Sequence, residues 1–180
     1  MKAHFGKSKL HGKGVFATKD IKKGETIFIL EGKKVKFLIN NEHQANIAGM
    51  NWVGYDKNTW IDPIHFSVYL NHFCTPNSFI KGKKKIAARF DIKKGEEITI
   101  DYSLNEGDIF WEMPCHCGAK NCRKIIKSIQ FLPLKTFEEN INFIPRYFQK
   151  VYKKFNISNF KNYSELKTKW IDFISKGFSV

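Results

Sequence analysis

The chain has 180 residues, 42% of them hydrophobic and 15% aromatic, which is enough apolar surface for one folded core. This content excludes a disordered chain, and only four cysteines in such a length exclude a disulfide-stapled miniprotein. The longest apolar runs are far shorter than the ~18 residues of a membrane span, and no apolar segment follows the first lysine. We therefore expect no membrane association and an intracellular protein, cytoplasmic or nuclear.

The net charge of +14 is compatible with a nucleic-acid partner bound through a basic surface. Two features weaken this interpretation. Only three of the 31 basic residues are arginine, the side chain that suits bidentate phosphate and base recognition. The excess is also spread evenly, at +8 over residues 1–105 and +6 over residues 106–180. The charge alone therefore establishes no function.

The first part of the chain predicts short strands separated by glycine turns. Strands are expected at 15–17, 25–30, 86–88 and 97–100, and 51–61 fits a hairpin around Gly54. The hexapeptide Asp20–Glu25 recurs unchanged as Asp91–Glu96, 71 residues later. Because this spacing is too long for a solenoid repeat, we interpret the two copies as the same Lys-Lys-Gly turn used twice.

The last third of the chain has the apolar period of helices. Phe137, Ile141 and Ile144 precede an apolar stripe over 147–155, and a final helix is predicted from an N-cap at Ser164 to Gly177. The predicted buried face of that last helix consists of Leu166, Trp170, Ile171 and Ile174. We interpret these residues as a cover over a β core, so the expected fold is mainly β with appended helices.

The four cysteines form a candidate metal site. Cys115, Cys117 and Cys122 lie in one short loop, and Cys74 lies 41 residues before the first of them. Reduced thiols grouped in this way favour zinc, which prefers four ligands in a tetrahedron. Three thiolates leave one position open, and the spacing alone assigns it either to Cys74 or to a histidine.

Four polar segments complete the pattern. They are HGKGVFA at 11–17, NHFCTPN at 71–77, GEEITIDY at 95–102 and CHCGAKNCR at 115–123. In this order and spacing they resemble the SET-domain protein lysine methyltransferases. The resemblance implies a SET-type fold of several small curved β-sheets with a knot-like crossing. It also implies a SET domain at 1–105, a post-SET zinc segment at 106–126 and a helical C-terminal extension at 127–180.

The same resemblance implies a role for individual residues. S-adenosylmethionine would be bound by His11, Gly12, Lys13, Gly14, Asn71, His72 and His116. Tyr102 would be the catalytic tyrosine that aligns the lysine amine, and Zn²⁺ would be held by Cys74, Cys115, Cys117 and Cys122. A dry channel would lower the pKa of that lysine, and its candidate walls are Phe73, Phe79, Phe110 and Trp111.

The implied activity is methyl transfer to the ε-amine of a lysine in a protein, with histones and non-histone proteins both as candidate substrates. The alternative is a zinc-stabilised SET-fold module that binds nucleic acid or chromatin without catalysis. Asn71, His72 and Tyr102 favour the enzyme, because a binding scaffold has no use for that trio.

The even positive charge raises a separate question, since it would repel a basic histone tail. Three answers are open: an acidic groove near Glu106, Asp108 and Glu112, a nucleic acid that bridges the two, or a substrate that is not a histone tail.

Overall fold

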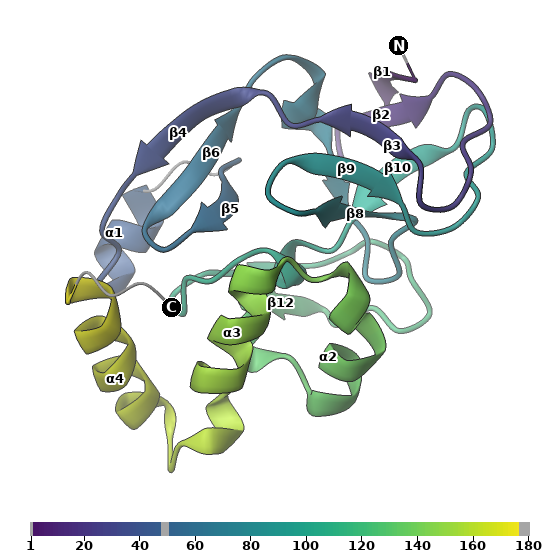
Figure 1. Ribbon diagram of the computed structural model, residues 1–180. Coiled ribbons are helices and arrows are strands. Elements are labelled where there is room, and N and C mark those ends of the chain that lie inside the picture. The colour runs from purple at the N-terminus through teal and green to yellow at the C-terminus, as the bar shows by residue number, and fades with distance from the viewer. Residues whose placement is uncertain (1, 48–50, 177–180) are drawn as a thin grey trace.

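The computed structural model describes residues 2–47 and 51–176, which form four small β-sheets followed by C-terminal helices (Figure 1). The strands are β1 (Ala3–Lys7), β2 (Lys13–Ala17), β3 (Thr26–Ile29), β4 (Gly32–Lys36), β5 (Val53–Asp56), β6 (Thr59–Pro63), β7 (Asn71–His72), β8 (Ser78–Lys81), β9 (Lys85–Ala88), β10 (Glu97–Ile100), β11 (Glu112–Pro114) and β12 (Ile125–Lys127). The helices are α1 (Glu42–Ile47), α2 (Leu134–Asn140), α3 (Arg146–Phe155) and α4 (Tyr163–Ser175), and short 3₁₀ turns, η1 to η5, lie at His65–Tyr69, Tyr102–Leu104, Ile129–Phe131, Ile141–Phe143 and Ile157–Asn159. Within these described ranges, no helix has the length and apolar character needed to cross a membrane.

The central sheet has the strand order β1-β2-β10-β7. Strand β10 runs antiparallel to β2 and parallel to β7, with Thr99 opposite Asn71 and Ile100 opposite His72. This parallel contact places the Asn-His pair beside the end of β10, immediately before Tyr102. The other sheets, β3-β9-β8, β4-β6-β5 and β11-β12, are antiparallel throughout. The knot-like crossing stays a prediction.

The two copies of the repeated hexapeptide lie against each other. Ile21 and Ile92 pair through both backbone hydrogen bonds. Asp91 accepts from the backbone N–H of Lys23 and pairs with the Lys22 ammonium, and Asp20 does the same with Lys94 and Lys93. Each turn is therefore completed by the aspartate of the other copy, which confirms that the same turn is used twice.

The buried apolar residues fall into two main clusters. One is formed by the β-sheets and includes Val15, Ile86 and Ile98. The other is formed by the C-terminal helices together with Leu104, Ile109, Ile129 and Leu132. The aromatic residues of the last third thus pack mainly with one another, and their contribution is a second core rather than only a cover for the first.

The predicted elements are largely present, with local differences. The hairpin β5–β6 turns at Lys57 and Asn58 instead of at Gly54, because Asn58 takes the left-handed conformation (φ 48°). Helix α4 begins after Asn162, whose side chain accepts from the N–H of Glu165, and not at Ser164. Phe173 is buried in α4 in place of Ile171. The predicted stop at Gly177 lies outside the described residues.

Candidate active site and metal centre

The segment from Ser8 to Gly14 is fastened to Asn71. The Asn71 Nδ2 atom lies 2.9 Å from the carbonyl oxygen of Lys13 and 3.3 Å from that of His11, so three of the predicted cofactor residues meet at one side chain. Among residues 2–47 and 51–176, no group donates to the Asn71 Oδ1 atom. The amide therefore holds the segment with its nitrogen.

The two glycines of this segment answer different requirements. Gly12 has φ 50°, a conformation that side chains disfavour, and the space around its missing Cβ is open. A Cβ on Gly14 would collide with the Glu97 carboxylate. A side chain at position 14 would therefore displace the Glu97 carboxylate from its present position, a contact that the sequence did not indicate.

His72 joins the predicted cofactor residues to the cysteines. Its Nδ1 atom accepts a hydrogen bond from the Tyr102 N–H (3.2 Å), and its Nε2 atom lies 3.3 Å from Cys74 Sγ. Burial, and then the charge of Arg123, lower the pKa of His72 to about 3. The ring is therefore neutral at physiological pH, and its 3.6 Å approach to Asp101 is not an ion pair.

Tyr102 lies beside this histidine. Its hydroxyl donates to the carbonyl oxygen of Leu70 (2.8 Å), the residue before Asn71. Burial raises the pKa of Tyr102 to about 12, so the phenol stays protonated. Of the four aromatic residues expected around it, Phe73 and Trp111 pack in the same cluster as Tyr102. The other two do not: Phe79 packs against Phe143, and Phe110 belongs to the helical core.

Three of the four predicted metal ligands, Cys74, Cys115 and Cys117, group together with His72, and Cys122 is not in this group. Ligand atoms of Cys74, Cys115, Cys117 and His72 lie within 4.8 Å of one another. Cys115 Sγ is 3.9 Å from Cys74 Sγ and 3.7 Å from Cys122 Sγ. Four sulfurs about 2.3 Å from one zinc ion at tetrahedral angles lie about 3.8 Å apart, so these separations fit zinc. Burial raises the pKa values of the Cys74 and Cys115 thiols, whereas a backbone hydrogen bond from Lys124 lowers the pKa of Cys122 to about 7.

A buried ion pair lies under the same site. Arg123 follows the last cysteine and donates through Nη2 to Asp101, which is 4% exposed. Burial alone would lower the pKa of Arg123, but the charge of Asp101 and this hydrogen bond outweigh it and raise the pKa. The Arg123 backbone N–H also points at Cys74 Sγ (3.5 Å). The pair fixes the cysteine loop to the strand end that carries Tyr102.

His116 stands apart from the other predicted cofactor residues. It is exposed between two buried cysteines, and in the described part of the chain no hydrogen bond connects it to the Asn71 group.

Ser8 and Glu97 also contribute to the site, although the sequence did not predict them. Both Glu97 oxygens lie within 2.9 Å of Ser8 Oγ, and one of them lies 2.8 Å from Asn71 Nδ2.

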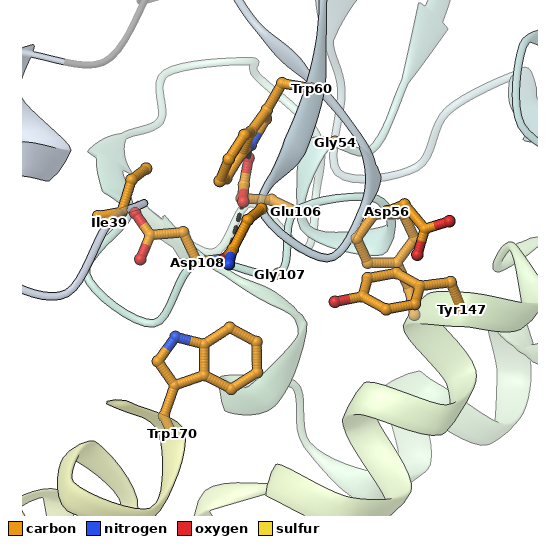
Figure 2. Close-up of a pocket in the computed structure, with 11 residues that line it drawn as sticks. Ile39, Gly54, Asp56, Trp60, Glu106, Gly107, Asp108, Tyr147 and Trp170 are labelled. Carbon is orange, nitrogen blue, oxygen red and sulfur yellow. Dashed lines mark hydrogen bonds between the residues drawn. The ribbon is translucent and has the colours of Figure 1, made fainter. Parts of the chain in front are cut away.

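The three acids considered for an open acidic groove do not form one. Glu106 and Asp108 are 6% and 5% exposed and line a pocket of about 310 Å³ of empty volume between the β5–β6 hairpin and the helices α3 and α4. Figure 2 shows Trp60 and Trp170 on either side of Glu106. Burial raises the pKa of Glu106 to about 8 and that of Asp108 to about 7. Only Glu112 is exposed, and it pairs with Lys127.

A larger groove lies between α1, the β11–β12 hairpin and the start of α4, with an empty volume of about 1200 Å³. Its walls are aromatic and aliphatic, with four charged residues: Glu42, Glu112, Lys127 and Lys161. Trp111, which packs in the Tyr102 cluster, lies in the chain between Phe110 and Glu112, two residues that line the groove. Its charges balance, so the groove itself is not acidic.

Comparison with known proteins gives a consistent result. The family model described as SET domain matches residues 12–103. Histone-lysine N-methyltransferase set-2 of Caenorhabditis elegans is 34% identical over 134 residues, which cover 66% of this chain and 9% of that protein. The H3 lysine-4 specific histone-lysine N-methyltransferase of Schizosaccharomyces pombe is 31% identical over 67% of this chain and 14% of its own length. The chain thus spans only a small part of these relatives.

Solved structures agree on the fold. The methyltransferase domain of human histone-lysine N-methyltransferase SETMAR superposes with a TM-score of 0.53 and 25% identity, over 71% of this chain and 59% of that one. KRYPTONITE, in complex with DNA, a histone H3 peptide and SAH, has a TM-score of 0.54 and 22% identity over 68% of this chain and 29% of that one. Both share the small β-sheets seen here.

Proposed function

Because the chain belongs to the SET domain family, we propose that it transfers a methyl group from S-adenosylmethionine to the ε-amine of a lysine in a protein substrate. The observation that carries this proposal is the partly buried Tyr102 side chain, whose hydroxyl is fixed beside the Asn71–His72 strand by its hydrogen bond to Leu70. The alternative, a binding module without catalysis, is less well supported, because a scaffold alone needs no phenol in this position.

The geometry supports an orienting role for Tyr102. When bound, S-adenosylmethionine would supply an electrophilic methyl carbon on a sulfonium. The neutral lysine nitrogen would bond to that carbon as the carbon–sulfur bond breaks, the sulfur would leave as a thioether, and the methylated nitrogen would release a proton to solvent. A phenol with a pKa of about 12 does not remove a proton from lysine at neutral pH. Its oxygen still has lone pairs that can accept from the amine and align it. Phe73 and Trp111 exclude water around this point, which favours the neutral amine.

For the metal we propose Zn²⁺ held by Cys74, Cys115, Cys117 and Cys122. The hydrogen bonds of His72 argue against the histidine as a ligand. Since its Nδ1 accepts from the Tyr102 N–H, the proton of the neutral ring lies on Nε2, which then donates to Cys74 Sγ. A protonated nitrogen cannot bind the metal, and the separation of 3.7 Å between Cys122 Sγ and Cys115 Sγ supports Cys122 as the fourth ligand.

We propose that the substrate peptide lies in the groove beside β11. All three residues of β11 are exposed, and the groove walls include both apolar rings and paired charges. A strand edge of this kind can accept an extended peptide. Because Glu42 and Glu112 are matched by Lys127 and Lys161, the groove gives no preference for a strongly basic tail. This balance favours a substrate of mixed charge, histone or non-histone.

The test is transfer of labelled methyl groups from S-adenosylmethionine to fractionated cell proteins and, in parallel, to histone octamers. Label on a lysine of at least one protein fraction is the expected result. Binding of the cofactor with no transfer to any fraction would instead leave the binding module as the better account. Repeating the assay with added DNA shows whether the basic surface recruits substrate through nucleic acid.

A further inference from the structure

Glu97, the first residue of β10, connects the two sides of the proposed cofactor site. One of its carboxylate oxygens lies 2.8 Å from Asn71 Nδ2, and the two oxygens lie 2.9 and 2.8 Å from Ser8 Oγ. One carboxylate thus accepts from a side chain of β7 and from the segment that carries Gly12 and Gly14.

Ser8 connects the Glu97 carboxylate to the backbone of segment 8–14. Its hydroxyl has one proton, which is directed to Glu97, so its lone pairs face the N–H groups of Leu10 (2.8 Å) and His11 (3.3 Å). The Ser8 N–H in turn donates to the carbonyl oxygen of Gly12 (3.0 Å). The turn formed by residues 8–12 is therefore organised around the Ser8 hydroxyl, and the Glu97 carboxylate sets the orientation of that hydroxyl.

Glu97 is itself held in place by its neighbours. The Glu97 carbonyl oxygen accepts from Asn77 Nδ2 (2.8 Å), and Asn77 Oδ1 accepts from the Thr99 N–H (3.0 Å). On the other side the backbone of Gly14 packs so closely that a Cβ there would collide with a Glu97 oxygen. Backbone and side chain of Glu97 are thus both held in place before any ligand is present.

The charge of Glu97 is not used in an ion pair. No lysine, arginine or histidine in the described part of the chain lies within 4.0 Å of this carboxylate, although the protein carries a net charge of +14. Its field also reaches the site: burial is the main cause of the raised pKa of Tyr102, a hydrogen bond with His72 opposes it, and the charge of Glu97 adds to the increase. An unpaired anion at this point suits a ligand with a positive sulfonium.

From this arrangement we propose that Glu97, acting with Ser8, is a positioning residue that holds segment 8–14 against Asn71 in the conformation that binds S-adenosylmethionine. This inference rests on the proposed function. It predicts that the segment is ordered before the ligand arrives, so the loss of the carboxylate weakens binding rather than methyl transfer from the saturated enzyme.

The experiment compares Glu97→Gln with Glu96→Gln, the adjacent exposed glutamate, whose carboxylate caps the Lys93 N–H in a surface turn. Calorimetric titration with S-adenosylmethionine should give a dissociation constant at least about tenfold higher for Glu97→Gln and an unchanged one for Glu96→Gln. The KM for the cofactor should rise in parallel, while kcat at saturation stays within about threefold. In the ligand-free protein, the N–H groups of Leu10 and His11 should exchange faster in Glu97→Gln.

Ser8→Ala provides the second arm, because it removes one partly buried hydroxyl and leaves the sheet intact. Ser8→Ala should also raise the dissociation constant for S-adenosylmethionine and speed the amide exchange of Leu10 and His11. The double variant should lose less binding free energy than the sum of the losses in the two single variants. Wild-type affinity in both Glu97→Gln and Ser8→Ala overturns the inference. Failure of the unaltered protein to bind S-adenosylmethionine would instead overturn the proposed function, so the two failures are distinguishable.

Discussion

The hydroxyl of Tyr102 and the carbonyl oxygen of Leu70 are joined by a hydrogen bond of 2.8 Å. This bond fixes the phenol from the backbone of the residue that precedes Asn71, so the orienting group and the proposed cofactor strand cannot move independently. The position of the phenolic oxygen is thereby set by the sheet.

Replacement of Tyr102 by phenylalanine should lower kcat by about 10- to 100-fold, because the lysine amine loses the oxygen that aligns it. Affinity for S-adenosylmethionine should change by less than about twofold, since that oxygen contacts Leu70 and not the cofactor-binding segment. Initial rates and calorimetry measure the two quantities. Tyr55→Phe, on the surface beside Lys34, is the matched control. An unchanged kcat for Tyr102→Phe would remove its assigned role.

Metal content separates the candidate ligands. Elemental analysis should find about one zinc per chain, lost in Cys122→Ser and retained in His72→Gln. The histidine variant should lose no more than about 10- to 100-fold in zinc affinity, the size expected when a donor to a ligand is removed. If Cys122→Ser retains zinc and His72→Gln loses it, then His72 and not Cys122 is the fourth zinc ligand.

Arg123→Met should destabilise the protein by about 3–5 kcal/mol, because it leaves the Asp101 charge buried without its partner. Arg146→Met removes an exposed arginine of α3 and should change stability by less than about 0.5 kcal/mol. Chemical denaturation of both variants at saturating zinc measures the difference. Equal stabilities would show that the Asp101–Arg123 pair contributes nothing.

The fold should become less stable as pH rises through the titration of Glu106. The pKa of this carboxyl is about 8 in the folded protein, against 4.5 for an ordinary glutamate. Between these values the unfolded chain binds fewer protons than the folded one, so the free energy of unfolding falls with increasing pH.

Glu106→Gln removes this titration, and it should be more stable than the wild type by a few kcal/mol above pH 8 and similar to it below about pH 4.5. Taking the difference between the two proteins cancels the opposite trend of His72, whose depressed pKa makes stability fall as pH decreases from 6.5 towards 3. Glu112→Gln removes an exposed carboxylate as the control. A pH-independent difference between wild type and Glu106→Gln would contradict the burial argument.

Much of the fold was predictable because the relevant residues follow a local rule. Polar and apolar residues alternate in strand β10, which follows a glycine turn, and the apolar stripe of α3 has a helical period. Strands β1 and β4 escaped prediction because they are short and mostly exposed, with three lysines among the five residues of β4. Their pairing depends on partners elsewhere in the chain, which no local pattern encodes.

The candidate site shows the same division. The convergence of Cys74 with the cysteine loop was foreseen through motif resemblance, and the structure brings these sulfurs together. Glu97 was not foreseen, because on its own it reads as an ordinary polar residue at the start of a strand. Its importance comes from Ser8, 89 residues away, and from the missing Cβ of Gly14.

The contacts between the two copies of the hexapeptide can form only after the second copy has been synthesised. Asp20 leaves the ribosome well before Lys93 and Lys94, its partners. At about 5–20 residues per second, that interval lasts roughly 4–15 s. Until then the first turn lacks its aspartate and lysine contacts, and the N-terminal strands have no β10 to pair with. During this interval the strands of the nascent N-terminal half are exposed to wrong pairing. The interval ends when the second copy of the hexapeptide and strand β10 leave the ribosome.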